Sequence, residues 1–249
     1  MKKEKEWFKE WFDTSFYHIL YQDRDYDEAE SFITTLSNFV QLPSNSYILD
    51  LACGKGRHSL QLNELGYRVK GVDLSENSIK EATKMENNSL SFEVGDMRIP
   101  LQNEIFDAVY NLFTSFGYFN STSENLKVLN AISSMLHPKG VFVIDFMNVE
   151  KAIYKMIPSE VIEKGNIQFL IEKSIENGQI IKSIKFSQND KAYSFQERVQ
   201  ALYKSDFEEL LSQTDLVIDH IFGNYQLASF DNQNSDRLIL LGHKKSIEK

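Results

Sequence analysis

The chain has few of the residues that cross-link a polypeptide or anchor it in a membrane. Its single cysteine, Cys53, excludes an internal disulfide and favours a reducing, cytoplasmic location. No run of about 18 apolar residues is present, so we expect no membrane contact through a spanning helix. The net charge of -9 disfavours non-specific binding to nucleic acid, which needs positive charge on the protein. With 249 residues, 42% of them hydrophobic, the sequence predicts one globular unit with its own core.

Aromatic residues are concentrated near the start of the chain. Between Trp7 and Tyr21 they recur at spacings of three and four, which predicts an apolar stripe on helices. Pro43 ends this pattern. We therefore expect residues 1–42 to form a helical segment, either as a lid over a site or as ordinary core packing.

Strand and helix patterns then alternate through residues 43–156 and return in residues 203–249. Strands are expected at 47–52, 67–74, 90–97, 106–113, 141–146, 216–223 and 237–244. Ser75 is expected to cap a helix, and capping boxes are expected at Ser121 with Glu124 and at Ser205 with Glu208. This alternation predicts an α/β fold with a mostly parallel sheet covered on both faces.

Residues 157–202 break this alternation. Asn177-Gly178 separates two β-rich runs, which is a strong hairpin signal because both turn positions need positive φ. A third strand is expected at 191–200. We expect a small antiparallel β insertion that either roofs an acceptor pocket or forms the interface of a homodimer.

The stretch "ILDLACGKGRHS" predicts a strand that turns into a helix around a nucleotide. The dinucleotide fingerprint fails at its third position, where Ser59 follows Gly54 and Gly56, and there is no triphosphate loop. Asp50 would repel a pyrophosphate at this point and would attract an amino group.

Two further acids end the next two strands, Asp73 and Asp96. An acid at the second strand end accepts hydrogen bonds from ribose hydroxyls, and one at the third can accept from an adenine amine. Each acid on its own also fits a plain turn or cap. Together with Asp50 they favour an adenosine that carries a zwitterionic amino acid and no phosphate.

The region 48–148 resembles the class I S-adenosylmethionine-dependent methyltransferases. "LDLACGKG", "GVDLS" and "GDMR" resemble their first three motifs, "FDAVYNLFTSFGYF" the fourth, and "LHPKGVFVIDF" the passage into the fifth strand. The resemblance implies a Rossmann-like, doubly wound, seven-stranded sheet with an antiparallel last strand. It also implies that S-adenosyl-L-methionine is the methyl donor and that the acceptor is a small molecule.

The resemblance also implies a role for each matched residue. Asp50 and Gly54 would hold the methionine moiety of the donor, in a loop completed by Ala52, Cys53 and Gly56. The remaining expected donor contacts are Asp73 and Leu74 at the ribose, Asp96 and Met97 at the adenine, and Asn111 and Leu112 at the floor. Family members often have glycine where Ala52 stands, so this loop is tighter than usual.

Methyl transfer requires alignment, exclusion of water and, for some acceptors, removal of a proton. Tyr17 and Tyr21 are expected to contact the donor from the lid, because an aromatic ring attracts the sulfonium charge. Tyr17, His18 and His58 are the candidate catalytic residues. A nucleophilic role for Cys53 is less favoured than packing.

Other site types are less well supported. The histidines lack metal-ligand spacing, so no metal site is expected. Asp145 and Asn148, near the end of the fifth expected strand, are expected to face the acceptor or to cap a loop. "NLFTSF" stands where a DNA base methyltransferase has its Asn/Asp-Pro-Pro-aromatic motif, which disfavours that function.

The sequence therefore favours an S-adenosylmethionine-dependent methyltransferase acting on an oxygen or nitrogen of a small soluble acceptor. A non-catalytic sensor or scaffold that binds the same donor remains open. An NAD-dependent oxidoreductase is a further alternative, disfavoured by Asp50 and Ser59.

Overall fold

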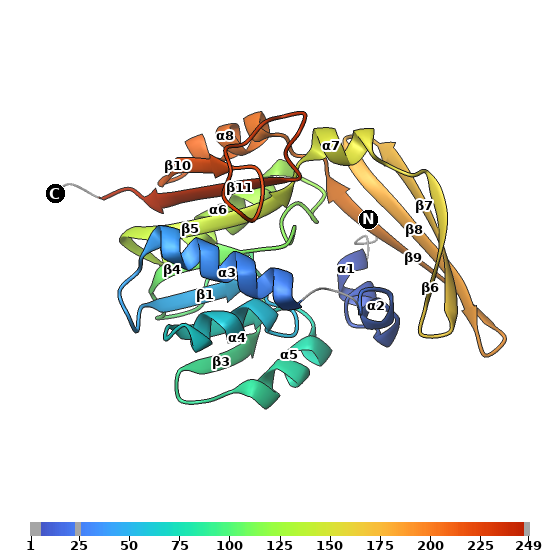
Figure 1. The fold of residues 1–249 in the computed structure, drawn as a ribbon, viewed down its shortest axis with the longest axis horizontal. Coiled ribbons are helices and arrows are strands. Elements are labelled where there is room, and N and C mark those ends of the chain that lie inside the picture. Colours follow the sequence, from blue (N-terminus) through green and yellow to red (C-terminus); the bar gives the residue numbers. More distant parts are fainter. Residues whose placement is uncertain (1–5, 23–25, 247–249) are drawn as a thin grey trace.

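The computed structural model describes residues 6–22 and 26–246 and contains two separate sheets (Figure 1). The larger sheet has seven strands in the order β10-β11-β5-β4-β1-β2-β3. Its strands are β1 (Tyr47–Leu51), β2 (Arg68–Asp73), β3 (Leu90–Val94), β4 (Phe106–Asn111), β5 (Leu136–Met147), β10 (Leu216–Phe222) and β11 (Arg237–Lys244). Strands β1 to β5 pair in parallel, and β11 is antiparallel to both of its neighbours. The predicted seven-stranded sheet with an antiparallel last strand is confirmed.

Helices cover both faces of this sheet because its central strands are apolar on both sides. Four of the five residues of β1 are buried, as are five of the six in β4. One face is covered by α3 (Tyr26–Val40), α4 (Arg57–Glu64) and α5 (Glu76–Ala82), and the other by α6 (Thr122–Met135) and α8 (Lys204–Ser212). The short helices η1 (Thr83–Met85) and α7 (Val149–Tyr154) complete this part of the fold.

One of the three expected helix caps is confirmed in full, and the other two differ from the prediction. Ser75 caps α5 as expected, because its Oγ accepts from the Ser78 N–H at 3.1 Å. Ser121 is the N-cap of α6, but its side chain makes no cap bond, and the Glu124 carboxylate accepts from Arg98 at 2.8 Å. Helix α8 begins before Ser205, with Tyr203 at its N-cap.

The smaller sheet consists of four antiparallel strands (Figure 1). They are β6 (Ser159–Lys164), β7 (Ile167–Glu176), β8 (Gln179–Gln188) and β9 (Lys191–Gln200). The hairpin at Asn177 and Gly178 is confirmed, with φ values of 50° and 73°. Strand β6 was not predicted, because its sequence, SEVIEK, lacks the regular alternation of apolar and polar residues that indicates a strand.

The N-terminal helices α1 (Trp7–Trp11) and α2 (Ser15–Leu20) lie between the two sheets (Figure 1). Trp11 and Leu20 are buried in one cluster with Ile167, Phe169 and Ile184 of the smaller sheet. This is a third core, apart from the two cores on the faces of the larger sheet. The helices and the insertion are therefore packed as one unit, although they are far apart in the sequence.

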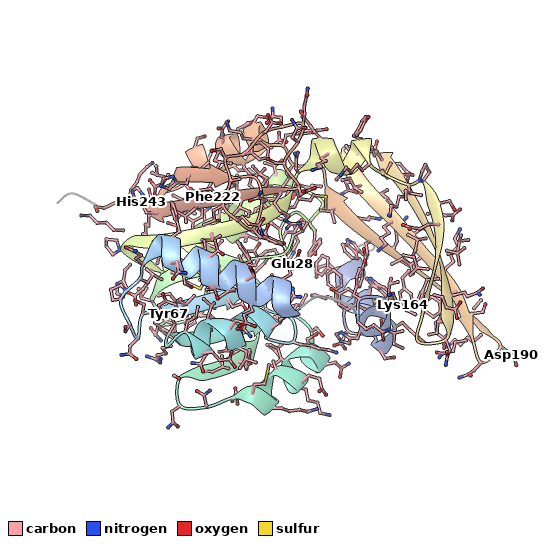
Figure 2. The ribbon with its side chains drawn as sticks, viewed as in Figure 1. Glu28, Tyr67, Lys164, Asp190, Phe222 and His243 are labelled. Atoms are coloured by element: carbon pink, nitrogen blue, oxygen red, sulfur yellow. The ribbon has the colours of Figure 1, made fainter. Side chains whose placement is uncertain are left out.

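The two ends of the molecule carry different elements. Figure 2 shows Asp190 at the outer tip of the smaller sheet and His243 at the opposite end, on β11. Within the ranges that the structure describes, the helices are too short and too polar to cross a membrane.

Candidate functional site

A cavity lies at the carboxyl ends of the parallel strands, where open α/β sheets bind their ligands. Residues after β1, β2, β3 and β4 form its inner wall, here called the strand-end wall. Residues of α1 and α2, together with Phe12, Tyr21 and Gln22 beside them, form the facing wall, here called the lid wall. The lining residues are Phe8, Phe12, Tyr17, His18, Tyr21, Gln22, Ala52, Cys53, Gly54, Lys55, Arg57, His58, Asp73, Leu74, Ser78, Gly95, Asp96, Met97, Leu112, Phe113, Ser115, Tyr118 and Phe119.

The loop between β1 and α4 turns through left-handed backbone conformations. Ala52, Gly54 and Gly56 have φ values of 64°, 56° and 78°. A Cβ on Gly54 would meet no atom within 4 Å, so the backbone of this residue borders open space. A Cβ on Gly56 would lie 2.6 Å from the Phe92 ring, so Gly56 is needed for packing behind the cavity rather than for its wall.

Asp73 lies on the strand-end wall and shapes the loop at the same time. Its Oδ2 accepts from the Gly54 N–H and its Oδ1 from the Ser75 N–H, each at 2.8 Å. Burial raises the pKa of this carboxyl, which these backbone donors partly offset. A carboxylate has about four acceptor positions, so Asp73 can also accept from a bound ligand.

Asp96 also reaches the wall, and Arg98 holds its carboxylate. Arg98 Nε lies 2.9 Å from Oδ1 and Nη2 lies 2.6 Å from Oδ2. Although partial burial acts to raise the pKa of Asp96, the hydrogen bonds and charge of Arg98 lower it overall. Arg98 also contacts Glu6 and Glu124, both at 2.8 Å, so the same cation ties the wall to the start of α1.

Asp50 stands behind the wall rather than on it. Only 1% of its surface is exposed, and it is not among the lining residues. Ser59 Oγ donates to Asp50 Oδ2 at 2.6 Å, which explains a serine at the third fingerprint position. Burial raises the pKa of Asp50 to about 6, and the nearby Asp73 charge adds to this.

Cys53 is a packing residue of the wall. Burial raises the pKa of its thiol, and the charges of Asp50 and Asp73 raise it further. The thiolate is the nucleophilic form, so this environment disfavours a nucleophilic Cys53.

Of the two expected floor residues, only Leu112 lines the cavity. Asn111 is fully buried and donates from Nδ2 to the Leu51 carbonyl at 2.9 Å, which links β4 to β1. Asn111 was expected to contact the donor, but it does not line the cavity and its side chain bonds within the sheet instead.

The lid wall contains Tyr17, His18 and Tyr21, which were among the candidate residues. Glu197 on β9 fixes this wall: it accepts from Trp11 Nε1 at 2.7 Å and from Tyr21 Oη at 2.8 Å. Lys182 on β8 donates to Tyr21 Oη at 2.5 Å. No residue of β6 to β9 is among the lining residues. The insertion therefore lies behind the lid wall and does not itself line the cavity.

A second contact ties the lid to the larger sheet. Asp13 Oδ1 accepts from Ser75 Oγ at 2.8 Å and from the Asn77 N–H at 3.0 Å. Ser75 follows Asp73 by two residues, so the lid is fastened beside the expected ribose position.

The cavity contains several residues that the sequence reasoning did not assign. His58 was a candidate and lines the cavity, but Arg57 beside it and Phe113 opposite were not singled out. The Arg57 guanidinium lies 5.2 Å from the centre of the Phe113 ring. Phe113 is the third residue of the motif "NLFTSF", and its positive φ of 58° has no signal in the sequence.

Asp145 and Asn148 were expected to face the acceptor or to cap a loop, and the structure favours the second, because neither residue lines the cavity and both bond to loop backbone. Asp145 is fully buried and pairs with Arg237 of β11 at 2.7 Å. Asn148 Nδ2 donates to the carbonyls of Asn232 and Ser235, both at 2.8 Å. Strand β11 and the loop before it supply these partners, and neither side chain is among the lining residues.

The described residues contain no group of three or more histidines, cysteines and acids placed to hold a metal ion.

Comparison with known proteins identifies the family. A family model described as "Methyltransferase domain" matches residues 42–198. The chain belongs to this methyltransferase family. The match spans β1 to β5 and nearly all of the smaller sheet.

Relatives in sequence cover only part of the chain. YqeM of Bacillus subtilis (strain 168), named as a methyltransferase, is 32% identical over 134 residues, which is 53% of this chain and 52% of that protein. The dTDP-3-amino-3,4,6-trideoxy-alpha-D-glucopyranose N,N-dimethyltransferase of Streptomyces venezuelae is 30% identical over 131 residues, 52% of this chain and 54% of that protein. The chain thus spans about half the length of these curated relatives.

The fold extends further than the sequence matches. An S-adenosylmethionine-dependent methyltransferase from Clostridium acetobutylicum ATCC 824 has a TM-score of 0.78 and 20% identity, over 92% of this chain and 96% of that one. At this identity the likeness concerns the fold, and it includes both sheets.

Proposed function

We propose that the chain is an enzyme that transfers a methyl group from S-adenosyl-L-methionine to a small soluble acceptor. The observation that carries this proposal is the cavity at three successive strand ends, with the Gly54 backbone, Asp73 and Asp96 on one wall. Membership of the methyltransferase family supports it.

The strand-end wall fits the donor. Gly54 borders open space and would hold the methionine moiety together with its neighbours Ala52 and Cys53. Asp50 lies behind this loop and would favour the donor's ammonium group through its charge rather than by contact.

The other two strand ends fit the nucleoside half of the donor. Asp73 and Leu74 would hold the ribose, and Asp96 and Met97 the adenine. Leu112 remains as the apolar floor.

The chemistry assigned to this chain is alignment and exclusion of water. When bound, the donor supplies a methyl carbon activated by its sulfonium. Tyr17, Tyr21 and the aromatic residues beside them line the cavity, and their rings would attract the positive charge of the sulfonium. His18 and His58 lie on the same cavity and are the candidates to accept a proton from the acceptor.

We propose an amine as the acceptor class, with a hydroxyl as the alternative. The Streptomyces relative is named as an N,N-dimethyltransferase of an amino sugar nucleotide, which supports nitrogen. The net charge of -9 supports a small molecule rather than nucleic acid. The cytoplasmic location and a homodimer stay predictions.

Intrinsic fluorescence offers a direct test, because both tryptophans of the chain, Trp7 and Trp11, lie on α1 of the lid. We expect S-adenosylhomocysteine to change the emission with a saturable dependence, and NADH to give no saturable binding. Methyl-labelled donor is then incubated with amino sugar nucleotides, amino acids and hydroxylated analogues. Binding of the donor product without transfer to any acceptor would favour a sensor, and binding of NADH alone would contradict the proposal.

A further inference from the structure

A buried ion pair lies outside the cavity and has no role in the function proposed so far. Asp145 on β5 is fully buried, and the Arg237 side chain on β11 keeps 17% of its surface exposed. Arg237 Nε and Nη2 both lie 2.7 Å from Asp145 Oδ1. Tyr225 Oη donates to the other oxygen at 3.2 Å. Burying two charges costs free energy, so a buried ion pair persists only when further hydrogen bonds satisfy both charged groups.

This pair holds the turn that follows β4. Phe113 and Thr114 have φ values of 58° and 59°, two consecutive left-handed residues that are not glycine. The Phe113 N–H donates to Asp145 Oδ2 at 2.8 Å, and the Thr114 N–H donates to the Asp145 carbonyl at 2.9 Å. Arg237 Nη2 donates to Thr114 Oγ1 at 2.9 Å. Such a backbone persists only where its surroundings compensate for the strain, and here the ion pair provides that compensation.

The turn determines where the Phe113 ring lies. The ring centre is 5.8 Å from the Arg237 guanidinium and 5.2 Å from that of Arg57. Phe113 and Arg57 both line the cavity, whereas Asp145 and Arg237 do not. Arg57 directly follows the loop from Ala52 to Gly56, so it borders the proposed position of the donor's amino-acid end.

We propose that Asp145 and Arg237 are positioning residues for the donor's amino-acid end. They hold the Phe113–Thr114 turn so that the Phe113 ring packs against Arg57, and Arg57 can then bind the donor's carboxylate with its planar fork. This inference rests on the proposed function, because it assumes that the cavity binds an S-adenosyl ligand.

Two ligands separate positioning from general damage to the fold. S-adenosylhomocysteine carries the amino-acid end, and 5′-methylthioadenosine lacks it. For Arg237→Met we expect the Kd of S-adenosylhomocysteine to rise about fivefold to tenfold, less than the loss of a whole charge-assisted hydrogen bond because Arg57 itself is retained, and the Kd of 5′-methylthioadenosine to change less than twofold. Thr114→Ala removes only the hydroxyl that Arg237 contacts, and we expect the same preference with a smaller rise.

The control is Lys70→Met, which breaks another partly buried ion pair, with Glu93 and Glu104, away from the cavity. It should lower the melting temperature and leave both dissociation constants unchanged. If Arg237→Met does not fold, folded Thr114→Ala decides the question. Equal weakening of both ligands, or no change in either, overturns the inference. A wild-type protein that binds neither ligand overturns the proposed function itself and this inference with it.

Discussion

The two walls of the cavity are built from contacts of very different range. On the strand-end wall, Ser59 reaches Asp50 across nine residues, and Gly54 reaches Asp73 across 19. On the lid wall, Trp11 and Tyr21 reach Glu197 across 186 and 176 residues. At β1 and β2 the first wall depends on local turns at the ends of packed strands, and the second wall depends on side chains that meet only in the finished fold. We therefore expect the strand-end wall to keep its shape when the lid is loosened.

The largest expected effect concerns the electrostatic cost of Asp50 behind the strand-end wall. Burial raises its pKa from 3.8 to about 6, so the folded chain holds this proton more tightly than the unfolded chain. Its contribution therefore favours folding below about pH 4 and is lost as the pH rises to about 6, by roughly 3 kcal/mol. Urea unfolding of wild type and Asp50→Asn between pH 4 and 7 should show a flatter pH dependence in the variant.

The exposed Glu208→Gln on α8 is the control for this measurement and should leave the pH dependence unchanged. Parallel pH profiles of wild type and Asp50→Asn would contradict the assignment.

The second effect tests whether the strand-end wall binds the donor. Asp73→Ala should weaken S-adenosylhomocysteine binding by about 1–3 kcal/mol, since it leaves polar groups of ligand and loop without a partner. Isothermal titration calorimetry gives the affinity. Asp107→Ala is the matched control, because Asp107 also accepts a backbone N–H, from Tyr47, but does not line the cavity. An affinity of Asp73→Ala within twofold of wild type would count against the site.

The third effect tests the lid wall. Tyr21→Phe removes a hydrogen bond to the Glu197 carboxylate and should lower the free energy of unfolding by about 1.5–3 kcal/mol. Tyr17→Phe, which keeps a ring whose centre lies 5.0 Å from that of Tyr21, is the companion variant. Thermal melts and the emission of Trp11 give the two readouts.

Glu172→Gln is the control on the same sheet, because its ion pair with Lys185 is largely exposed and should contribute little. The affinity for S-adenosylhomocysteine is measured in Tyr17→Phe, Tyr21→Phe, Tyr17→Ala and Tyr21→Ala. An unchanged affinity in all four variants would show that the lid does not contribute to donor binding.

The smallest expected effect tests whether the backbone of the loop between β1 and α4 is strained at Ala52. Ala52 has a φ of 64°, a conformation that glycine adopts more readily. Ala52→Gly should therefore leave stability unchanged or raise it by up to about 1 kcal/mol. Ala131→Gly, inside helix α6, should instead lower stability by about 1 kcal/mol. Chemical denaturation compares the two, and a marked loss in Ala52→Gly would contradict the strain argument.

The sequence predicted the strand-end wall well because its signals are local. The glycine loop and the acids at the strand ends follow from spacing alone, and Asp73 and Asp96 both reach the cavity. The depth of a side chain has no such signal. Asp50 and Asn111 were expected on the wall and lie behind it. Asp50 accepts a hydrogen bond from Ser59, and Asn111 donates one to the Leu51 carbonyl.

Partners distant in the sequence could not be predicted. Glu197 fixes the lid, but in the sequence it is one charged residue in the alternation of β9. Asp145 looked like an acceptor contact because Arg237, which pairs with it, lies 92 residues further on. The left-handed turn at Phe113 likewise depends on that pair and not on its own residue type.

The shared core of the lid and the insertion also sets an order of events during synthesis. Trp11 is made early, whereas Phe195 and Glu197, which cover its ring and bind its N–H, come about 186 residues later. At about 5–20 residues per second, the ribosome needs about 10–40 s to supply them. During that interval Trp11 and Leu20 are synthesised but lack the smaller sheet that buries them. The cavity can therefore close only after the strands and helices around β1 to β5 have left the ribosome.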